Sequence, residues 1–119
     1  MSKSIVGEKS YRFAIRIVNL YKWLCEEKKE YVLSKQLLRS GTAIGALLKE
    51  AEHGQSKSDF LNKVNIALKE ANESAYWLML LKDTGYIIGK EFDSIIKDAE
   101  ELIKMLVSIV KTTKNKLGK

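Results

Sequence analysis

The single histidine of the chain stands three residues after a carboxylate, in the sequence Glu50-x-x-His53. On a helix this spacing places both side chains on one face, as in the carboxylate-bridged di-metal sites of four-helix bundles. Such a site needs two of these motifs and a carboxylate from each of the other two helices. One histidine cannot supply that ligand set, so we predict no metal site and no cofactor.

Two other arrangements could support catalysis, and neither fits. Cys25 and His53 are each the only residue of their type, and they are expected on different helices. A nucleophile with an adjacent base therefore exists in composition only. Arg39 is too far from His53 along the chain to match the closely spaced Arg…His motif of some helical ribonucleases, and no glycine-rich phosphate loop is present. We predict that the protein is not an enzyme.

A pattern near the N-terminus is suited to binding. Lys9, Arg12, Arg16, Asn19 and Trp23 are spaced by three, four, three and four residues, so they share one side of a helix. Cations on one ridge could follow a phosphate backbone, and an indole could stack on a base. The same spacing is also typical of a solvated face with Trp23 at the edge of the core. Together with two cations of the next helix, the candidate nucleic-acid-binding residues are Lys9, Arg12, Arg16, Lys35 and Arg39.

A second basic pattern lies near the C-terminus, where lysines recur every seven residues at Lys90, Lys97, Lys104 and Lys111. Asp93 and Glu100 precede two of these lysines by four residues, the favourable orientation for ion pairs on a helix. We therefore expect this stripe to be largely self-neutralised and solvated. The basic tail at 111–119 is unbalanced and mobile, and it could add diffuse attraction to phosphate without specificity.

Composition and periodicity predict that all these residues lie on helices. The 119 residues contain no proline, and apolar residues recur with helical spacing in four segments. We expect helices at about residues 8–26, 33–53, 57–83 and 90–114, within a single domain that spans residues 1–119. The predicted fold class is all-α, an antiparallel up-down four-helix bundle that assembles into a cyclic homo-oligomer.

Residues that end or begin helices lie between the predicted segments. Gly54 can close the second helix in the left-handed conformation. Ser56 and Asp59 have the spacing of a capping box at the start of the third helix. Gly85 is suited to closing that helix at its other end.

The second helix contains the sequence Gly41-x-x-x-Gly45. Each glycine costs up to about 1 kcal/mol of helix propensity relative to alanine. The pair therefore indicates either a close helix crossing or a bend, and tight packing is the simplest compensation.

The third helix is predicted to be covered on more than its core face. The expected core face is Phe60, Leu61, Val64, Ala67, Leu68, Ala71, Ala75, Leu78 and Met79. Beside it runs a second stripe: Ile66, Glu70, Glu73, Trp77 and Leu81. Residues 76–81 are also six apolar residues in succession, and a helix that is apolar all round must be buried all round.

A single four-helix bundle leaves one face of each helix in solvent, so a neighbouring subunit is the natural cover for the second stripe. We predict that its five residues form a subunit interface. Glu70 and Glu73 would pair there with Lys or Arg across the contact, because a partly buried carboxylate needs a partner. The alternative is that they orient a bound group.

The runs LLRSGTAIGALLKEA, KSDFLNKVNIALKEANES and YWLMLL resemble the four-helix-bundle family of 23S rRNA intervening-sequence proteins. The accessory proteins of diversity-generating retroelements form a similar group. The resemblance extends over most of the chain and is strongest around the second and third helices. It implies an antiparallel four-helix bundle that forms a homopentamer, with an RNA-binding role.

The net charge of +6 and the sequence pI of about 9.4 permit binding to nucleic acid or to another acidic surface. The leading hypothesis is a non-catalytic RNA- or nucleic-acid-binding accessory protein that acts as a basic oligomeric ring. The alternative is a structural scaffold or protein-interaction module, for example for a reverse transcriptase or another nucleic-acid enzyme, without a direct nucleic-acid role. Because no signal-peptide core and no long apolar run is evident, we expect a cytoplasmic, soluble protein with no membrane partner.

Overall fold

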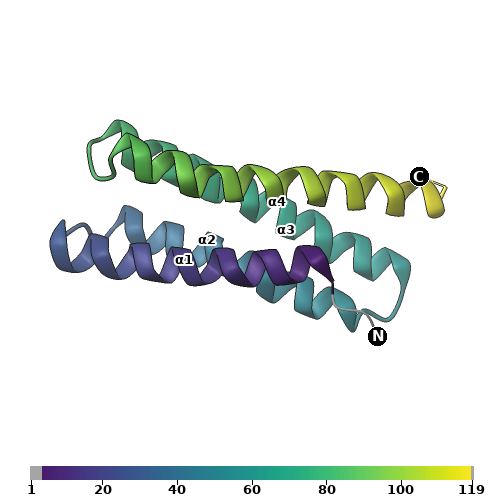
Figure 1. The fold of residues 1–119 in the computed structure, drawn as a ribbon. Coiled ribbons are helices and arrows are strands. Elements are labelled where there is room, and N and C mark those ends of the chain that lie inside the picture. The colour runs from purple at the N-terminus through teal and green to yellow at the C-terminus, as the bar shows by residue number, and fades with distance from the viewer. Residues whose placement is uncertain (1–3, 119) are drawn as a thin grey trace.

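The computed structural model describes residues 4–118, and these form four helices and no strand. The helices are α1 (Ile5–Glu27), α2 (Leu33–Glu52), α3 (Lys57–Asp83) and α4 (Gly89–Lys116). Consecutive helices run in opposite directions, and the start of α1 and the end of α4 lie at the same end of the molecule (Figure 1). The prediction of an all-α, four-helix chain is confirmed.

The first and last helices are longer than expected. α1 begins at Ile5 because the hydroxyl of Ser4 accepts a hydrogen bond from the backbone N–H of Gly7 at 3.1 Å and so caps the helix. α4 continues to Lys116, so most of the segment expected as a mobile tail is helical. Lys119, the last residue of that expected tail, lies outside the described residues.

The helix-end predictions are mostly confirmed. The hydroxyl of Ser56 accepts from the N–H of Asp59 at 3.0 Å, and the Asp59 carboxylate reaches back to the N–H of Gln55 at 3.3 Å. Gly85 follows α3 with a φ of 86°, the left-handed conformation that glycine adopts without strain. The prediction for Gly54 is wrong, because its φ is not positive.

A buried carboxylate caps α2, and the sequence analysis missed it. Glu30 is 8% exposed, and it accepts hydrogen bonds from the backbone N–H groups of Val32 at 3.2 Å, Leu33 at 2.9 Å and Ser34 at 2.6 Å. These are amides at the start of a helix that have no partner within it. Burial alone would raise the pKa of Glu30, but these hydrogen bonds outweigh it and lower the pKa below its ordinary value.

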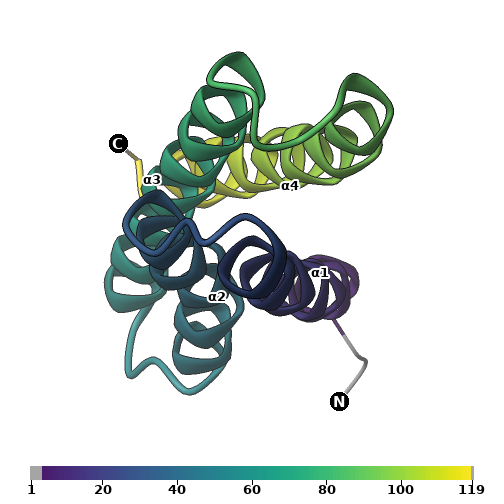
Figure 2. The same ribbon diagram turned by 90° about the vertical axis from the view of Figure 1, so that its left-hand side faces the viewer.

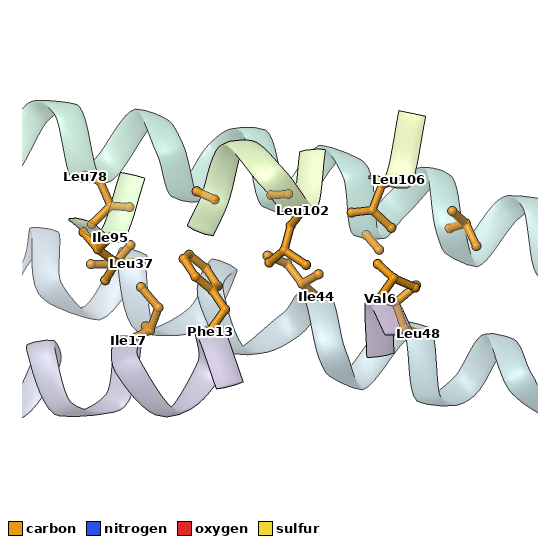
Figure 3. Close-up of a cluster of buried hydrophobic side chains, with 14 of the residues drawn as sticks. Val6, Phe13, Ile17, Leu37, Ile44, Leu48, Leu78, Ile95, Leu102 and Leu106 are labelled. Carbon is orange, nitrogen blue, oxygen red and sulfur yellow. The ribbon is translucent and has the colours of Figure 1, made fainter. Parts of the chain in front are cut away.

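All four helices contribute to one hydrophobic core (Figure 3). Side chains from every helix are at most 1% exposed: Phe13 and Ile17 of α1, Leu37 of α2, Leu78 of α3 and Leu102 of α4. Each such side chain stabilises the fold by roughly 1.5–3 kcal/mol relative to exposure. The core thus extends along the length of the bundle.

α1 and α2 approach closely at Gly41. A Cβ atom at this position would lie 2.8 Å from Cγ1 of Ile17, which is closer than packed carbon atoms allow. At the next helix pair, the hydroxyls of Ser40 and Ser74 are 2.9 Å apart and fully buried. The glycine pair of α2 therefore serves a close helix crossing, one of the two interpretations suggested by the sequence.

α1 and α4 contact each other least of the four adjacent helix pairs. Figure 2 views the bundle from the end that carries the loop between α3 and α4, and at this end the ribbons of α1 and α4 stand apart. A cleft of about 650 Å³ lies between them, with Trp23 and Leu20 on one wall and Ile87 and Ile88 on the other. Ion pairs also link α1 and α4, as described next.

Candidate nucleic-acid and subunit interfaces

The ridge of Lys9, Arg12, Arg16, Asn19 and Trp23 on α1 is termed the N-terminal basic stripe. Two of its cations are bound by carboxylates of α4. Lys9 Nζ lies 2.9 Å from Glu101 Oε1, and Arg16 Nη1 lies 2.6 Å from Asp98 Oδ2. Arg16 also donates to the hydroxyl of Ser94 at 3.1 Å. These contacts join α1 to α4. They also neutralise two of the cations that the sequence predicted to bind phosphate.

Arg12 and Arg39 are also paired within the chain. Arg12 Nη2 lies 3.0 Å from Glu8 Oε1, one helical turn earlier on α1. Arg39 of α2 donates to Glu70 at 3.3 Å and to Glu73, both on α3. Of the five predicted nucleic-acid-binding residues, Lys35 alone has no ion pair in the part of the chain that the structure describes.

The two acidic residues of α3 also differ from expectation. Glu70 and Glu73 were expected to pair with a cation across a subunit contact, but their cation is Arg39 of the same chain. Glu73 additionally accepts a hydrogen bond from the indole N–H of Trp77 at 3.3 Å. The carboxylates are thus satisfied within one bundle, because α2 and α3 pack side by side.

The lysines of α4, unlike the paired cations of α1 and α2, form no ion pair within residues 4–118. The expected ion pairs to Lys97 and Lys104 are absent among the described residues, where Asp93 and Glu100 contact neither lysine. The prediction of a self-neutralised stripe is therefore wrong for this structure. No acidic residue follows Glu101 in the sequence. The exposed cations beyond it, which we term the distal α4 lysines, are Lys104, Lys111, Lys114 and Lys116.

Leu81 cannot contribute to a subunit interface, because it is fully buried in the core of its own bundle. The prediction failed because the core face was projected with 3.6 residues per turn. In the structure the buried residues of α3 from Val64 onward repeat every seven residues: Val64, Ala67, Ala71, Ser74, Leu78 and Leu81. A seven-residue repeat drifts by about 20° per repeat from a straight helical face. The same drift moves Met79, expected in the core, to 52% exposure.

The outer face of α3 nevertheless exposes apolar side chains. Ile66 is 36% exposed and Tyr76 is 58% exposed, and Met79 adds to them. Trp77 is half-buried, and its ring meets that of Tyr76 edge-on at 5.1 Å between centroids. We term Ile66, Tyr76, Trp77 and Met79 the α3 apolar face. Sequence reasoning identified two of these residues and missed Tyr76 and Met79.

A second partly apolar surface lies between α1 and α2. A groove of about 600 Å³ there is floored by small residues that include Ala14, Gly45 and Ala46. Tyr11 borders the groove and is 69% exposed. This groove and the α3 apolar face lie on different helices, so they are two separate surfaces.

The residues considered for catalysis do not meet. Cys25 lies near the end of α1, and exposed His53 lies at the far end of α2, where its backbone N–H donates to Glu50. The length of α2 separates them. Among residues 4–118, no group of three or more His, Cys, Asp or Glu side chains is placed to hold a metal ion. None of the helices described combines the length and apolar character that a bilayer span requires.

Comparisons with known proteins cover most of the chain. A family model described as 23S rRNA-intervening sequence protein matches residues 2–108. The chain is similar to the 1.70 Å crystal structure of a protein of unknown function from the S23 ribosomal protein family of Bacteroides thetaiotaomicron VPI-5482. The two sequences are 59% identical, with 90% of this chain and 99% of that chain covered and a TM-score of 0.89. No curated protein matches the sequence.

Proposed function

The chain belongs to the 23S rRNA-intervening sequence protein family, and on that premise we propose that it is a non-catalytic accessory protein that binds RNA. The observation that carries the proposal is the excess of cations. Lysines and arginines number 21 against 15 acidic residues, so a net charge of +6 remains after every internal ion pair is formed. A surplus of this sign attracts phosphate independently of sequence.

The proposed binding mode is electrostatic and tolerant of sequence. Most of the cations are lysines, which are point charges without the planar fork that reads a base edge. Phosphate contacts position a protein on nucleic acid, whereas base contacts give specificity. We therefore expect similar affinity for unrelated RNAs of equal length.

The proposal includes assembly into a closed cyclic homo-oligomer, with a pentamer as the expected number of subunits from the family resemblance. The support is the α3 apolar face, whose exposed side chains a single bundle leaves uncovered. The groove between α1 and α2 is a second, different surface, and contact between two different surfaces is head-to-tail, which closes into a ring when the rotation between subunits permits. Several weak basic patches on one ring would then bind RNA with avidity.

The second candidate function is a scaffold for another protein, such as a reverse transcriptase or another nucleic-acid enzyme. Exposed Tyr76 and Met79 favour this alternative, since aromatic residues and methionine are enriched in protein interfaces. In that case the basic surface would bind an acidic region of the partner, and the protein itself would not bind RNA.

A salt titration separates the two candidates. The purified protein is titrated with an rRNA fragment and with an unrelated RNA of the same length, at rising salt. The RNA-binding proposal predicts that both bind alike and that log affinity falls linearly with log salt. Absence of binding to either RNA at about 50 mM salt, where electrostatic attraction is strong, would contradict it and leave the scaffold.

A further inference from the structure

We infer that the distal α4 lysines, Lys104, Lys111, Lys114 and Lys116, form the surface that contacts the RNA phosphate backbone. The inference rests on the proposed function and names the part of the molecule that performs it. The candidate RNA-binding surface therefore moves from the N-terminal basic stripe, which the sequence favoured, to α4. The sequence had suggested that the lysines of α4 are neutralised by neighbouring carboxylates.

The first argument is the distribution of carboxylates along α4. All five acidic residues of this helix precede Leu102, and two of them, Asp98 and Glu101, are bound to α1. From Leu102 to Gly118 the chain contains lysines and no acidic side chain. The charge of α4 is therefore polarised, with its acidic half joined to α1 and its distal half unbalanced.

The second argument is the neighbouring helix. α3 runs antiparallel to α4, so the first half of α3 lies beside the distal half of α4 (Figure 1). Asp59 is the one acidic residue from Lys57 to Lys69, and its carboxylate is occupied by the N–H of Gln55. Lys57 and Lys69 are exposed, so this neighbour adds cations rather than neutralising charge.

The helix dipole explains only part of the pattern. Cations in the last turn of a helix are stabilised by its negative end, which accounts for Lys114 and Lys116. The effect falls off beyond the last turn, so Lys104 and Lys111 are not explained by it. These two lie seven residues apart on one face, about 10.5 Å along the helix, a spacing that lets separate phosphates be contacted.

The number of contacts gives a measurable consequence. If four lysines each displace one counterion from a single strand, log affinity should fall against log salt with a slope of about −2.8. That slope corresponds to a loss of about 50-fold between about 50 and 200 mM salt.

The test compares two variants that each remove four positive charges. In the first, Lys104, Lys111, Lys114 and Lys116 are replaced by Gln. In the control, Lys22, Lys35, Lys90 and Lys97 are replaced by Gln; they are exposed and have no ion pair among the described residues. All eight side chains lie outside the core, and circular dichroism verifies that both variants stay helical.

We expect the distal variant to lose at least tenfold in RNA affinity at low salt and to lose most of its salt slope, with a much smaller change in the control. If the wild type binds RNA and both variants lose affinity equally, or neither does, the inference is overturned while the proposed function stands. If the wild type binds no RNA, the proposed function itself fails. Loss of binding to an acidic polypeptide by the distal variant would then identify a protein as the partner of this surface.

Discussion

The guanidinium of Arg16 on α1 lies 2.6 Å from the carboxylate of Asp98 on α4. In the sequence Arg16 belongs to a ridge of cations that could follow a phosphate backbone. In the fold two cations of that ridge meet the acidic half of α4, because Lys9 pairs with Glu101 as Arg16 does with Asp98. The basic surface available to a ligand is therefore decided by the contact between these two helices.

Freeing these cations should increase RNA binding. We predict that Asp98→Asn combined with Glu101→Gln raises RNA affinity and steepens the salt slope by one to two charges, because Arg16 and Lys9 become available to phosphate. Exposed ion pairs contribute little, so the free energy of unfolding should fall by less than about 1 kcal/mol per pair. RNA titration at several salt concentrations measures the effect.

The matched control is Glu26→Gln with Glu27→Gln, which makes the same change in net charge at the end of α1. An equal rise in affinity for both double variants would mean that net charge alone matters and that Arg16 and Lys9 do not reach the RNA.

Glu30 should stabilise the fold through the start of α2. We predict that Glu30→Gln lowers the free energy of unfolding at neutral pH by about 1 kcal/mol, since a charged acceptor for three backbone amides is replaced by a neutral one. Chemical denaturation measures the difference, and exposed Glu27→Gln serves as the control.

The same residue predicts a pH dependence. The pKa of Glu30 is lower in the folded protein than its ordinary value of 4.5. Its stabilisation is therefore fully present above the ordinary pKa and is lost as the pH falls through the folded pKa. The difference between wild type and Glu30→Gln should shrink in acid. A difference that stays constant down to full protonation would show that the carboxylate charge is not what caps α2.

The close crossing of α1 and α2 should make Gly41 intolerant of a side chain. Alanine is favoured over glycine in a helix by about 1 kcal/mol, yet we predict that Gly41→Ala destabilises by about 1–3 kcal/mol because its Cβ would press on Ile17. Gly89→Ala, which meets no atom within 4 Å, should be neutral or stabilising. Thermal unfolding of the pair tests this, and equal melting temperatures would argue against a tight crossing.

The α3 apolar face should be the subunit contact. We predict that Met79→Glu or Ile66→Glu lowers the mass measured by light scattering while helicity is kept, because both side chains are exposed in the single bundle. Trp77→Glu should have the same effect with some loss of stability, since its indole also packs on the core. Val32→Glu, at an exposed position in the loop before α2, is the control. Retention of the parent's mass by Met79→Glu and Ile66→Glu would place the interface elsewhere.

The sequence predicted the helices well and the surfaces poorly, for a physical reason. Helix positions follow from periodicity and capping within short segments, as Ser56 and Asp59 illustrate. Ion pairing depends on which helices become neighbours. Asp98 is far from Arg16 along the chain. No rule based on neighbouring residues indicates that Asp98 pairs with Arg16 of α1 and not with a lysine of α4.

The failures at Leu81 and Glu30 have causes of the same kind. The drift of a seven-residue core repeat is small over one turn, but over the 27 residues of α3 it exchanges Leu81 and Met79 between core and surface. Glu30 follows a backbone reversal at Lys29, whose φ is 54°, and it looks in sequence like one more charge in a polar connector.

Lysine footprinting in the presence of RNA tests the central claim most directly. Exposed lysines are acylated with and without RNA, and the modified sites are quantified by mass spectrometry on the unmutated protein. The account predicts that RNA protects Lys104, Lys111, Lys114 and Lys116, whereas Lys22 and Lys35 keep their reactivity. Protection of Lys35 together with Lys9, and none on distal α4, would contradict it and return the binding surface to the N-terminal basic stripe.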